Sequence, residues 1–212
     1  LESLEKRGLL TNEFRKTILG AETLATLEDI YLPYRPKRRT RATIAKEKRL
    51  EPLALKIWGQ EDFDVNEAAA KYVDSNTGTI NGVDNVQDAL TGARDIIAEW
   101  VSENTIARRE IRKLFWSEGT FSSSVISGKR EEASKYRDYF EWKEPVIKVP
   151  SHRVLAMLRG EKESMLSINI SPPAVQAVAL LQNIFITGET QASDEINQAI
   201  KDRYKPLLEA SM

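Results

Sequence analysis

Apolar residues recur along most of the chain with the spacing of one face of an α-helix. The clearest case is residues 85–101, where the polar positions fall between apolar ones three and four residues apart. The apolar positions there are Val86, Ala89, Leu90, Ala93, Ile96, Ile97, Trp100 and Val101. This spacing predicts a helix over 85–101, with Trp100 on its buried face.

Weaker versions of the same pattern predict further helices. Gly8, Gly20 and Gly59 follow three of them, as glycines commonly follow the last turn of a helix. Ser151 and Ser193 precede apolar stripes and are predicted to be N-caps, and Lys205-Pro206 is expected to interrupt the last helix. The predicted ranges are about 1–7, 12–19, 22–31, 41–48, 52–58, 104–115, 131–140, 151–158 and 193–207.

Two segments do not have a helical pattern. Residues 74–84 are polar, contain two glycines and predict a loop, whereas 165–170 alternate apolar and polar residues as a strand does. A single strand needs a partner, which is either the stretch 146–149 or a segment outside this sequence; the second option is favoured. The expected fold class is therefore mainly α, a multi-helix platform with a short β element near 165–170.

The order of these elements suggests three regions. Residues 1–60 are expected to form short helices with a basic arm at 33–49, and residues 61–150 a helical core. Residues 151–212 are expected to hold a helix, a short strand and a C-terminal helix that leads into a downstream domain. The sequence begins with Leu1 and not with an initiator Met, so we expect a piece of a longer protein.

Composition removes several classes of function. The 212 residues are 41% hydrophobic with a formal net charge of -1, so bulk charge would not bind a polyanion. There is no Cys, which excludes disulfides and zinc-thiolate sites and fits a reducing cytoplasm. The longest apolar runs fall far short of the roughly 20 residues that cross a bilayer, so no membrane partner is expected.

The sequence also contains no complete catalytic or ligand-binding motif. His152 is the only histidine, which rules out a multi-histidine metal site. Gly128-Lys129 does not complete a phosphate loop, because Ser123 stands where that loop needs glycine and Arg130 where it needs Ser or Thr. We therefore expect no enzymatic activity, metal, cofactor or small-molecule substrate in this region.

Positive charge is concentrated in one segment. Residues 35–49 hold eight basic residues and one acidic residue. Pro33 and Pro36 favour an extended backbone, and Tyr31 and Tyr34 flank the start, which suits phosphate contacts and base stacking. The alternative is that these cations pair with acidic surfaces and fasten the segment down. Charge alone leaves both interpretations open.

Several long motifs resemble the bacterial Tex family of transcription accessory proteins. They are ETLATLEDIYLPYRPKRRTRATIAKEKRLEPLA, ALTGARDIIAE, SGKREEASKYRDYF, PSHRVLAMLRGEKE and IKDRYKPLLEAS, in that order along nearly the whole sequence. The resemblance, to the N-terminal region of the family, implies a cytoplasmic, mainly helical platform. It also implies that the full-length protein continues into RNase H-like (YqgF), helix-hairpin-helix and OB-type RNA-binding domains, none of which these residues contain.

The resemblance implies RNA or single-stranded DNA as partner of the full-length protein, with transcription machinery as a further partner. We expect this region to add non-specific phosphate contacts; the alternative is a scaffold that packs downstream domains and docks to transcription machinery. The motif LPYRPKRRTR supplies the candidate nucleic-acid-binding residues Arg35, Lys37, Arg38, Arg39 and Arg41. No role is assigned to the matching residues of PSHRVLAMLRG, which are Ser151, His152, Arg153, Arg159 and Gly160.

Overall fold

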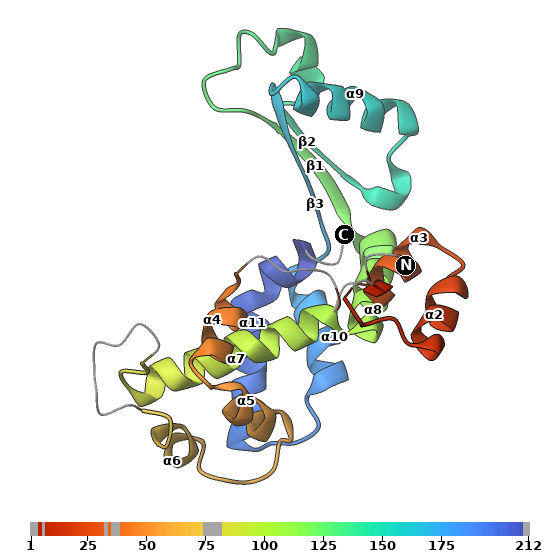
Figure 1. Ribbon diagram of the computed structural model, residues 1–212. Helices are drawn as coiled ribbons and strands as arrows, with labels where there is room; N and C mark the ends of the chain where they lie inside the picture. Colours follow the sequence, from red (N-terminus) through yellow and green to blue (C-terminus); the bar gives the residue numbers. More distant parts are fainter. Residues whose placement is uncertain (1–3, 6, 32–33, 35–38, 74–81, 210–212) are drawn as a thin grey trace. The chain divides into compact units, whose positions relative to one another are not determined.

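The computed structural model describes residues 4–5, 7–31, 34, 39–73 and 82–209, with the side chains of residues 25 and 203–209 left out. The described chain is predominantly helical with one small antiparallel sheet, which confirms the mainly α prediction (Figure 1). It divides into two compact units, one formed by Leu1–Arg108 with Leu181–Ser211 and the other by Arg109–Leu180. Among the described helices none is long and apolar enough to cross a membrane.

The first unit is organised around the long helix α7, Val86–Glu103. The apolar stripe predicted from the sequence is its buried face, which includes Ile96 and Ile97. Trp100 is only half-buried, at 5.6 Å between ring centroids from Trp58. The helices packed against α7 are α4 (Arg41–Glu47), α5 (Glu51–Trp58), α6 (Val65–Ala70) and α11 (Gln191–Glu209) (Figure 1).

Polar N-caps start several helices where the sequence places Thr, Asp or Asn. The Thr11 side chain accepts from the backbone of Phe14 at the start of α2 (Asn12–Leu19), and Asn85 caps α7 in the same way. Helix α3 (Leu24–Tyr31) follows α2. Each cap satisfies a backbone N–H that the first turn of a helix leaves without an intrahelical partner.

The prediction that Ser193 caps the last helix is wrong. Helix α11 begins at Gln191, and the Thr190 hydroxyl accepts from the Ser193 backbone N–H at 3.1 Å, as an N-cap does. The Ser193 hydroxyl instead donates to Gln60 Oε1 at 3.0 Å and is buried. The helix also continues to Glu209, past the interruption expected at Pro206, where a proline removes only one backbone hydrogen bond.

The second unit contains the sheet, with strand order β2-β1-β3 and antiparallel pairing throughout. Strand β3, Leu166–Ser171, confirms the strand predicted at 165–170. Its partner is β1, Thr120–Val125, so both expected partners are wrong. Strand β2, Glu141–Pro145, pairs with the other edge of β1, and Val146–Lys148 form the short 3-10 helix η3.

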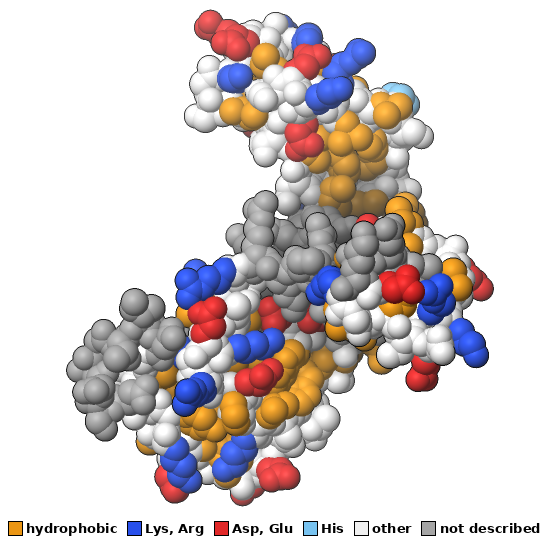
Figure 2. Space-filling view, viewed as in Figure 1, with side chains coloured by type: hydrophobic (Ala, Val, Ile, Leu, Met, Phe, Trp, Pro, Cys, Tyr) orange, Lys and Arg blue, Asp and Glu red, His pale blue; other side chains and the backbone are white. Residues whose placement is uncertain are grey.

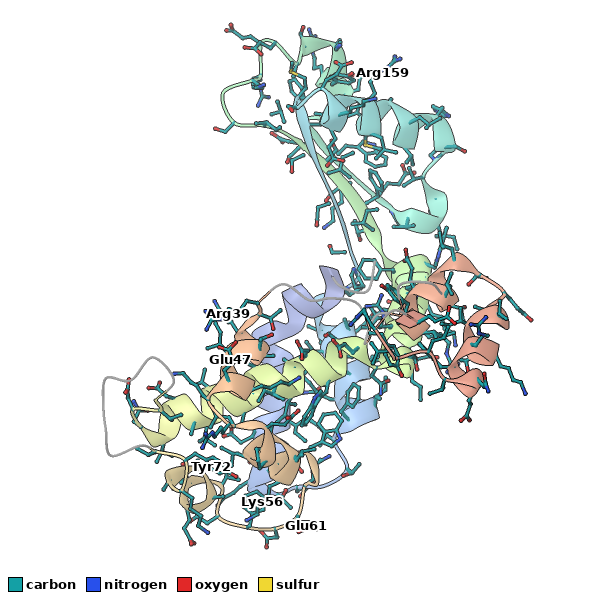
Figure 3. The ribbon with its side chains drawn as sticks, in the orientation of Figure 1. Arg39, Glu47, Lys56, Glu61, Tyr72 and Arg159 are labelled. Atoms are coloured by element: carbon teal, nitrogen blue, oxygen red, sulfur yellow. The ribbon has the colours of Figure 1, made fainter. Side chains whose placement is uncertain are left out.

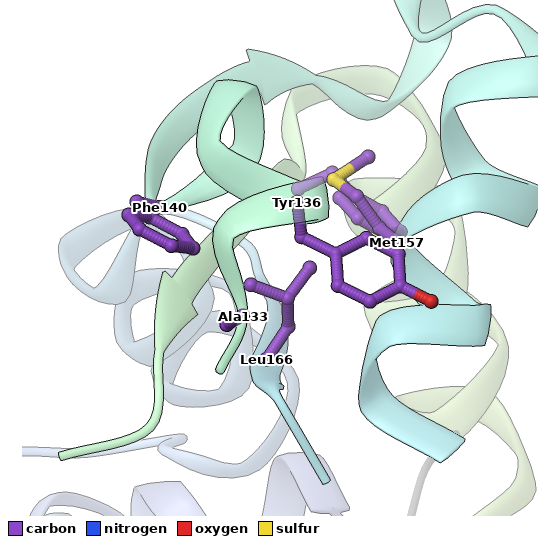
Figure 4. Packing of buried hydrophobic residues seen from close by; sticks show 6 residues of the cluster. Ala133, Tyr136, Phe140, Met157 and Leu166 are labelled. Carbon is purple, nitrogen blue, oxygen red and sulfur yellow. The ribbon is translucent and has the colours of Figure 1, made fainter. Parts of the chain in front are cut away.

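A compact apolar core lies beside this sheet (Figure 4). Met157 comes from helix α9, Ser151–Lys162, and Tyr136 from the 3-10 helix η2, Ser134–Tyr139. The helix predicted over 131–140 is therefore a shorter 3-10 helix in the structure. The buried members of the cluster are Phe121, Ala133, Tyr136, Phe140, Met157 and Leu166.

The prediction that Ser151 caps α9 is also wrong. Pro150 precedes the helix and no side chain caps its first turn. The Pro150 carbonyl accepts from Arg153 N at 3.0 Å and from Val154 N at 3.3 Å. Proline is compatible with this position because its fixed φ suits the start of a helix and it lacks an N–H that would need a partner. Helices α8 (Thr105–Glu118) and α10 (Ala174–Phe185) carry the chain between the two units.

Candidate nucleic-acid interface

The basic segment leads into helix α4 of the first unit. Arg35, Lys37 and Arg38 lie outside the described residues. Arg39 and Arg41 stand on either side of Thr40, whose hydroxyl accepts from the Thr43 N–H and begins the helix. The structure thus places two of the five predicted phosphate-binding side chains, both exposed, at the N-terminal end of α4.

Arg39 has an acidic partner. Its guanidinium Nη2 lies 2.7 Å from Oε2 of Glu47, at the other end of α4 (Figure 3). The two side chains are 62% and 41% exposed, so water screens the pair and its contribution to stability is at most about 1 kcal/mol. A phosphate group could therefore replace Glu47 as the partner of Arg39 at small cost.

Lys46 serves a structural purpose. Its Nζ lies 2.8 Å from Glu99 Oε2 on α7, and the Thr40 hydroxyl donates to Glu99 Oε1 at 3.3 Å. Burial lowers the pKa of Lys46, but the hydrogen bond and the negative charge of Glu99 outweigh burial and raise the pKa overall. Glu99 therefore holds both the start and the last turn of α4 against α7.

Three cations of the segment make no ion pair with any described residue, namely Arg41, Lys48 and Arg49. Arg41 and Lys48 line a shallow groove between α4 and α7, whose opposite wall carries Asp88 and Asp95. Figure 2 shows the same mixture on a larger scale, with Lys and Arg interspersed among Asp and Glu on the visible face. The groove itself has balanced charge, so phosphate contacts would come from its outer rim.

The floor of this groove is closely packed. A Cβ added at Gly92 on α7 would lie 2.4 Å from Leu50 Cδ1 and 3.3 Å from the Ala45 Cβ. Leu50 is 1% exposed and cannot move aside. Glycine at position 92 therefore lets α4 and Leu50, which precedes α5, pack closely on α7.

The PSHRVLAMLRG motif forms α9 of the second unit, where Arg153 and Gly160 have contacts with the sheet. Arg153 donates to Glu144 Oε2 on β2 at 3.2 Å. A Cβ on Gly160 would lie 2.6 Å from Leu166 Cδ1 on β3. Ser151, His152 and Arg159 are exposed, and no three acidic or histidine side chains among the described residues converge on a metal position.

Sequence reasoning missed a second basic surface, on α8. Arg109, Arg112, Lys113 and Trp116 follow one another at helical spacing and line an open groove with Ser117 and Ile147. Between them, Glu110 accepts from Lys113 and Arg109, which lowers the pKa of its carboxyl. The spacing of these residues, opposite the buried face of α8, was present in the sequence and could have revealed the surface.

Comparison with known proteins places the chain in a family. The family model described as Tex central region-like matches residues 60–205. Protein YhgF of Escherichia coli is 42% identical over 171 residues, which cover 81% of this chain and 22% of that protein. Protein tex of Bordetella pertussis is 41% identical over 170 residues, covering 80% of this chain and 21% of that protein.

A third relative has a functional name. The transcriptional accessory protein Tex of Neisseria gonorrhoeae is 40% identical over 168 residues, covering 79% of this chain and 21% of that protein. The chain thus spans only about a fifth of the length of these relatives. Because the family model covers more than half of the chain and agrees with these relatives, the chain belongs to the Tex family, of which it holds the central region.

Proposed function

We propose that this Tex-family region makes non-specific contacts with the phosphate backbone of RNA or single-stranded DNA through its basic segment. The observation that carries the proposal is charge density. Residues 35–49 hold eight basic residues and one acidic residue in a chain of net charge -1. Such a segment attracts a polyanion without reading its bases, because each neutralised phosphate releases counterions.

The geometry of α4 supports this proposal. Arg41 and Arg49 are exposed, Lys48 is partly exposed, and none of the three forms an ion pair with a described residue. Arg41 begins helix α4 and Lys48 and Arg49 follow its end, and this helix is anchored to α7 by the hydrogen bonds of Glu99 with Lys46 and Thr40. Binding would therefore not have to order this helix first, which lowers the entropic cost of the contact.

The names of the relatives supply the biological setting. A relative named as a transcriptional accessory protein supports a role in transcription, in which this region would act within a longer protein. We place that protein in the cytoplasm and assign no catalytic step, cofactor or small-molecule substrate to these residues. Base-specific recognition is not part of the proposal, because the contacts are to phosphates.

A second function, a scaffold that docks to transcription machinery, has its own supporting observation. Two cations of the basic segment already have acidic partners, Arg39 with Glu47 and Lys46 with Glu99. The acidic wall of the groove, Asp88 and Asp95, offers further negative charge beside α4. In this alternative the basic segment fastens helices together and binds no nucleic acid.

One experiment separates the two functions. The 212-residue chain and a full-length relative are titrated with the same labelled single-stranded RNA and DNA over a series of salt concentrations. Phosphate binding predicts that log affinity of the chain falls linearly with log salt, by about 0.7 for each phosphate neutralised on a single strand. Absence of binding by the chain at low salt, with binding retained by the longer relative, would favour the scaffold.

A further inference from the structure

Two large apolar side chains are exposed together on the second unit. Trp116, near the end of α8, is 71% exposed, and Ile147, in η3, is 69% exposed. Both line the same open groove, whose other walls are the side chains of α8. Exposing an indole ring costs hydration free energy that burial would recover, so an exposed Trp beside a second exposed apolar residue is typical of a binding surface.

The cations beside Trp116 are regularly spaced. Arg109, Arg112 and Lys113 precede it by seven, four and three residues, so all four side chains lie along one face of α8. Side chains three or four residues apart on a helix are separated by about 5–6 Å between Cβ atoms. Arg109 and Lys113 are each 65% exposed, and both contact the single carboxylate of Glu110.

The second unit as a whole also carries a net positive charge. Residues 109–180, all of them described, contain twelve Lys or Arg and nine Asp or Glu, a net charge of +3, although the whole chain carries -1. The long-range field of this unit therefore attracts a polyanion, while the ring of Trp116 offers a surface on which a flat group can stack.

We infer that Trp116, with Arg109, Arg112, Lys113 and Ile147, forms a base-stacking site for single-stranded nucleic acid. A base packs on the indole ring against Ile147, and the strand continues along α8 with its phosphates at the cations. Stacking on an aromatic ring is available only to bases that are unpaired, so the ligand is single-stranded. The inference shares its class of ligand with the proposed function but uses different residues in a different unit.

An apolar protein segment is the competing occupant. The core of a protein interface is depleted of charged residues, whereas three cations border Trp116 here. The groove offers only two large exposed apolar side chains, Trp116 and Ile147. The combination of one aromatic ring, one aliphatic neighbour and a line of cations suits a nucleotide chain better than a hydrophobic peptide.

The test compares two strands that differ only in their bases. The 212-residue chain is titrated with labelled oligothymidylate and with a labelled abasic strand of the same length, and the fluorescence anisotropy of the label on each strand is recorded. The wild-type chain should bind oligothymidylate more tightly than the abasic strand. Trp116→Ala should weaken oligothymidylate binding by about fivefold to a hundredfold, the range that loss of stacking on one ring gives, and leave abasic binding unchanged.

Two further variants sharpen the result. Trp116→Phe keeps a ring and should retain most of the preference for bases. Leu155→Ala removes another large side chain of the second unit, 67% exposed on α9, and should change neither titration. If Trp116→Ala binds oligothymidylate like the wild type, or weakens both strands equally, the stacking site is refuted. That outcome leaves the basic segment untouched, since its contacts hold for both strands alike.

Discussion

Asp29 on α3 and Arg108 on α8 form a buried ion pair, with Arg108 Nε 2.5 Å from Asp29 Oδ1. Their side chains are 10% and 7% exposed, and 79 residues separate them in the chain. Neither charge can be left in the interior without the other, because an isolated buried charge carries a large desolvation penalty.

Removing one partner should therefore be costly. Arg108→Met leaves Asp29 buried without its cation and should lower the free energy of unfolding by about 3–5 kcal/mol, measured by urea denaturation. The double change Asp29→Leu with Arg108→Met should recover most of the loss, because it removes both buried charges. A loss below about 0.5 kcal/mol in Arg108→Met would show that Arg108 is not needed to compensate the buried charge of Asp29.

Gly119 should not tolerate a side chain. A Cβ at this position would lie 2.1 Å from the carbonyl oxygen of Phe115, in the last turn of α8. That oxygen belongs to the backbone and cannot rotate away, so the turn itself must shift. Gly119→Ala should cost about 1–3 kcal/mol of unfolding free energy. Gly188→Ala, where the nearest atom is 3.8 Å away, is the matched control and should change stability by less than about 0.5 kcal/mol.

The contrast between α7 and β1 shows what the sequence could predict about the fold. In α7 the apolar positions repeat over 18 residues, so the periodicity alone located the helix and its buried face. Strand β1 has the sequence TFSSSV, with Phe121 as its only large side chain. Ser123 is buried between β2 and β3, and this position follows from tertiary pairing that no local pattern announces.

The helix caps and the candidate site also combine features that the local sequence predicts with features that depend on tertiary packing. Thr190 and Ser193 are both good capping residues three positions apart, and the choice between them involves the hydrogen bond from Ser193 to Gln60, 133 residues away. Charge density located the basic segment in the sequence. The partner of Lys46 is Glu99, 53 residues away, so which cations are held by acidic residues depends on how α4 packs on α7.

The ionisation of Glu195 should lower the free energy of unfolding as the pH rises above the pKa that its carboxyl has in the unfolded chain. Burial raises the pKa of its carboxyl, assisted by Asp194 and Asp202 and opposed by Arg94, whose Nη1 lies 3.5 Å away. The folded chain then keeps a proton that the unfolded chain releases near pH 4.3. Stability contributed by this group is therefore present below that pH and is lost as pH rises through the raised pKa.

Glu195→Gln provides the comparison, because it cannot ionise. The unfolding free energy of the wild type relative to Glu195→Gln should fall between pH 4 and pH 7, measured in urea at constant ionic strength. Glu189→Gln, at an exposed position, controls for the change of net charge. If the unfolding free energy of the wild type instead rose relative to that of Glu195→Gln as pH increases, the attraction of Glu195 to Arg94 would exceed the cost of burying its charge.

The basic segment can be tested through its described cations. Changing Arg41, Lys48 and Arg49 together to Gln should flatten the plot of log affinity against log salt by about 2, and weaken all single-stranded sequences alike. Changing Lys16, Lys56 and Lys71 to Gln removes the same charge from exposed positions of the same unit and should leave the slope nearly unchanged. If the two triple variants flatten the salt plot equally, the basic segment contributes only through the net charge of the unit.

The division of the chain at residues 108 and 181 has a consequence for synthesis on the ribosome. The first unit is discontinuous: α7 ends at Glu103, but α11, which packs against it, begins only at Gln191, 88 residues later and beyond the inserted unit Arg109–Leu180. At about 5–20 residues per second, this delay lasts roughly 4–18 s. During that time the apolar face of α7 that α11 covers is exposed, while the inserted unit already has all its strands. We expect the nascent chain to complete its second unit first and to need protection of α7 until α11 emerges.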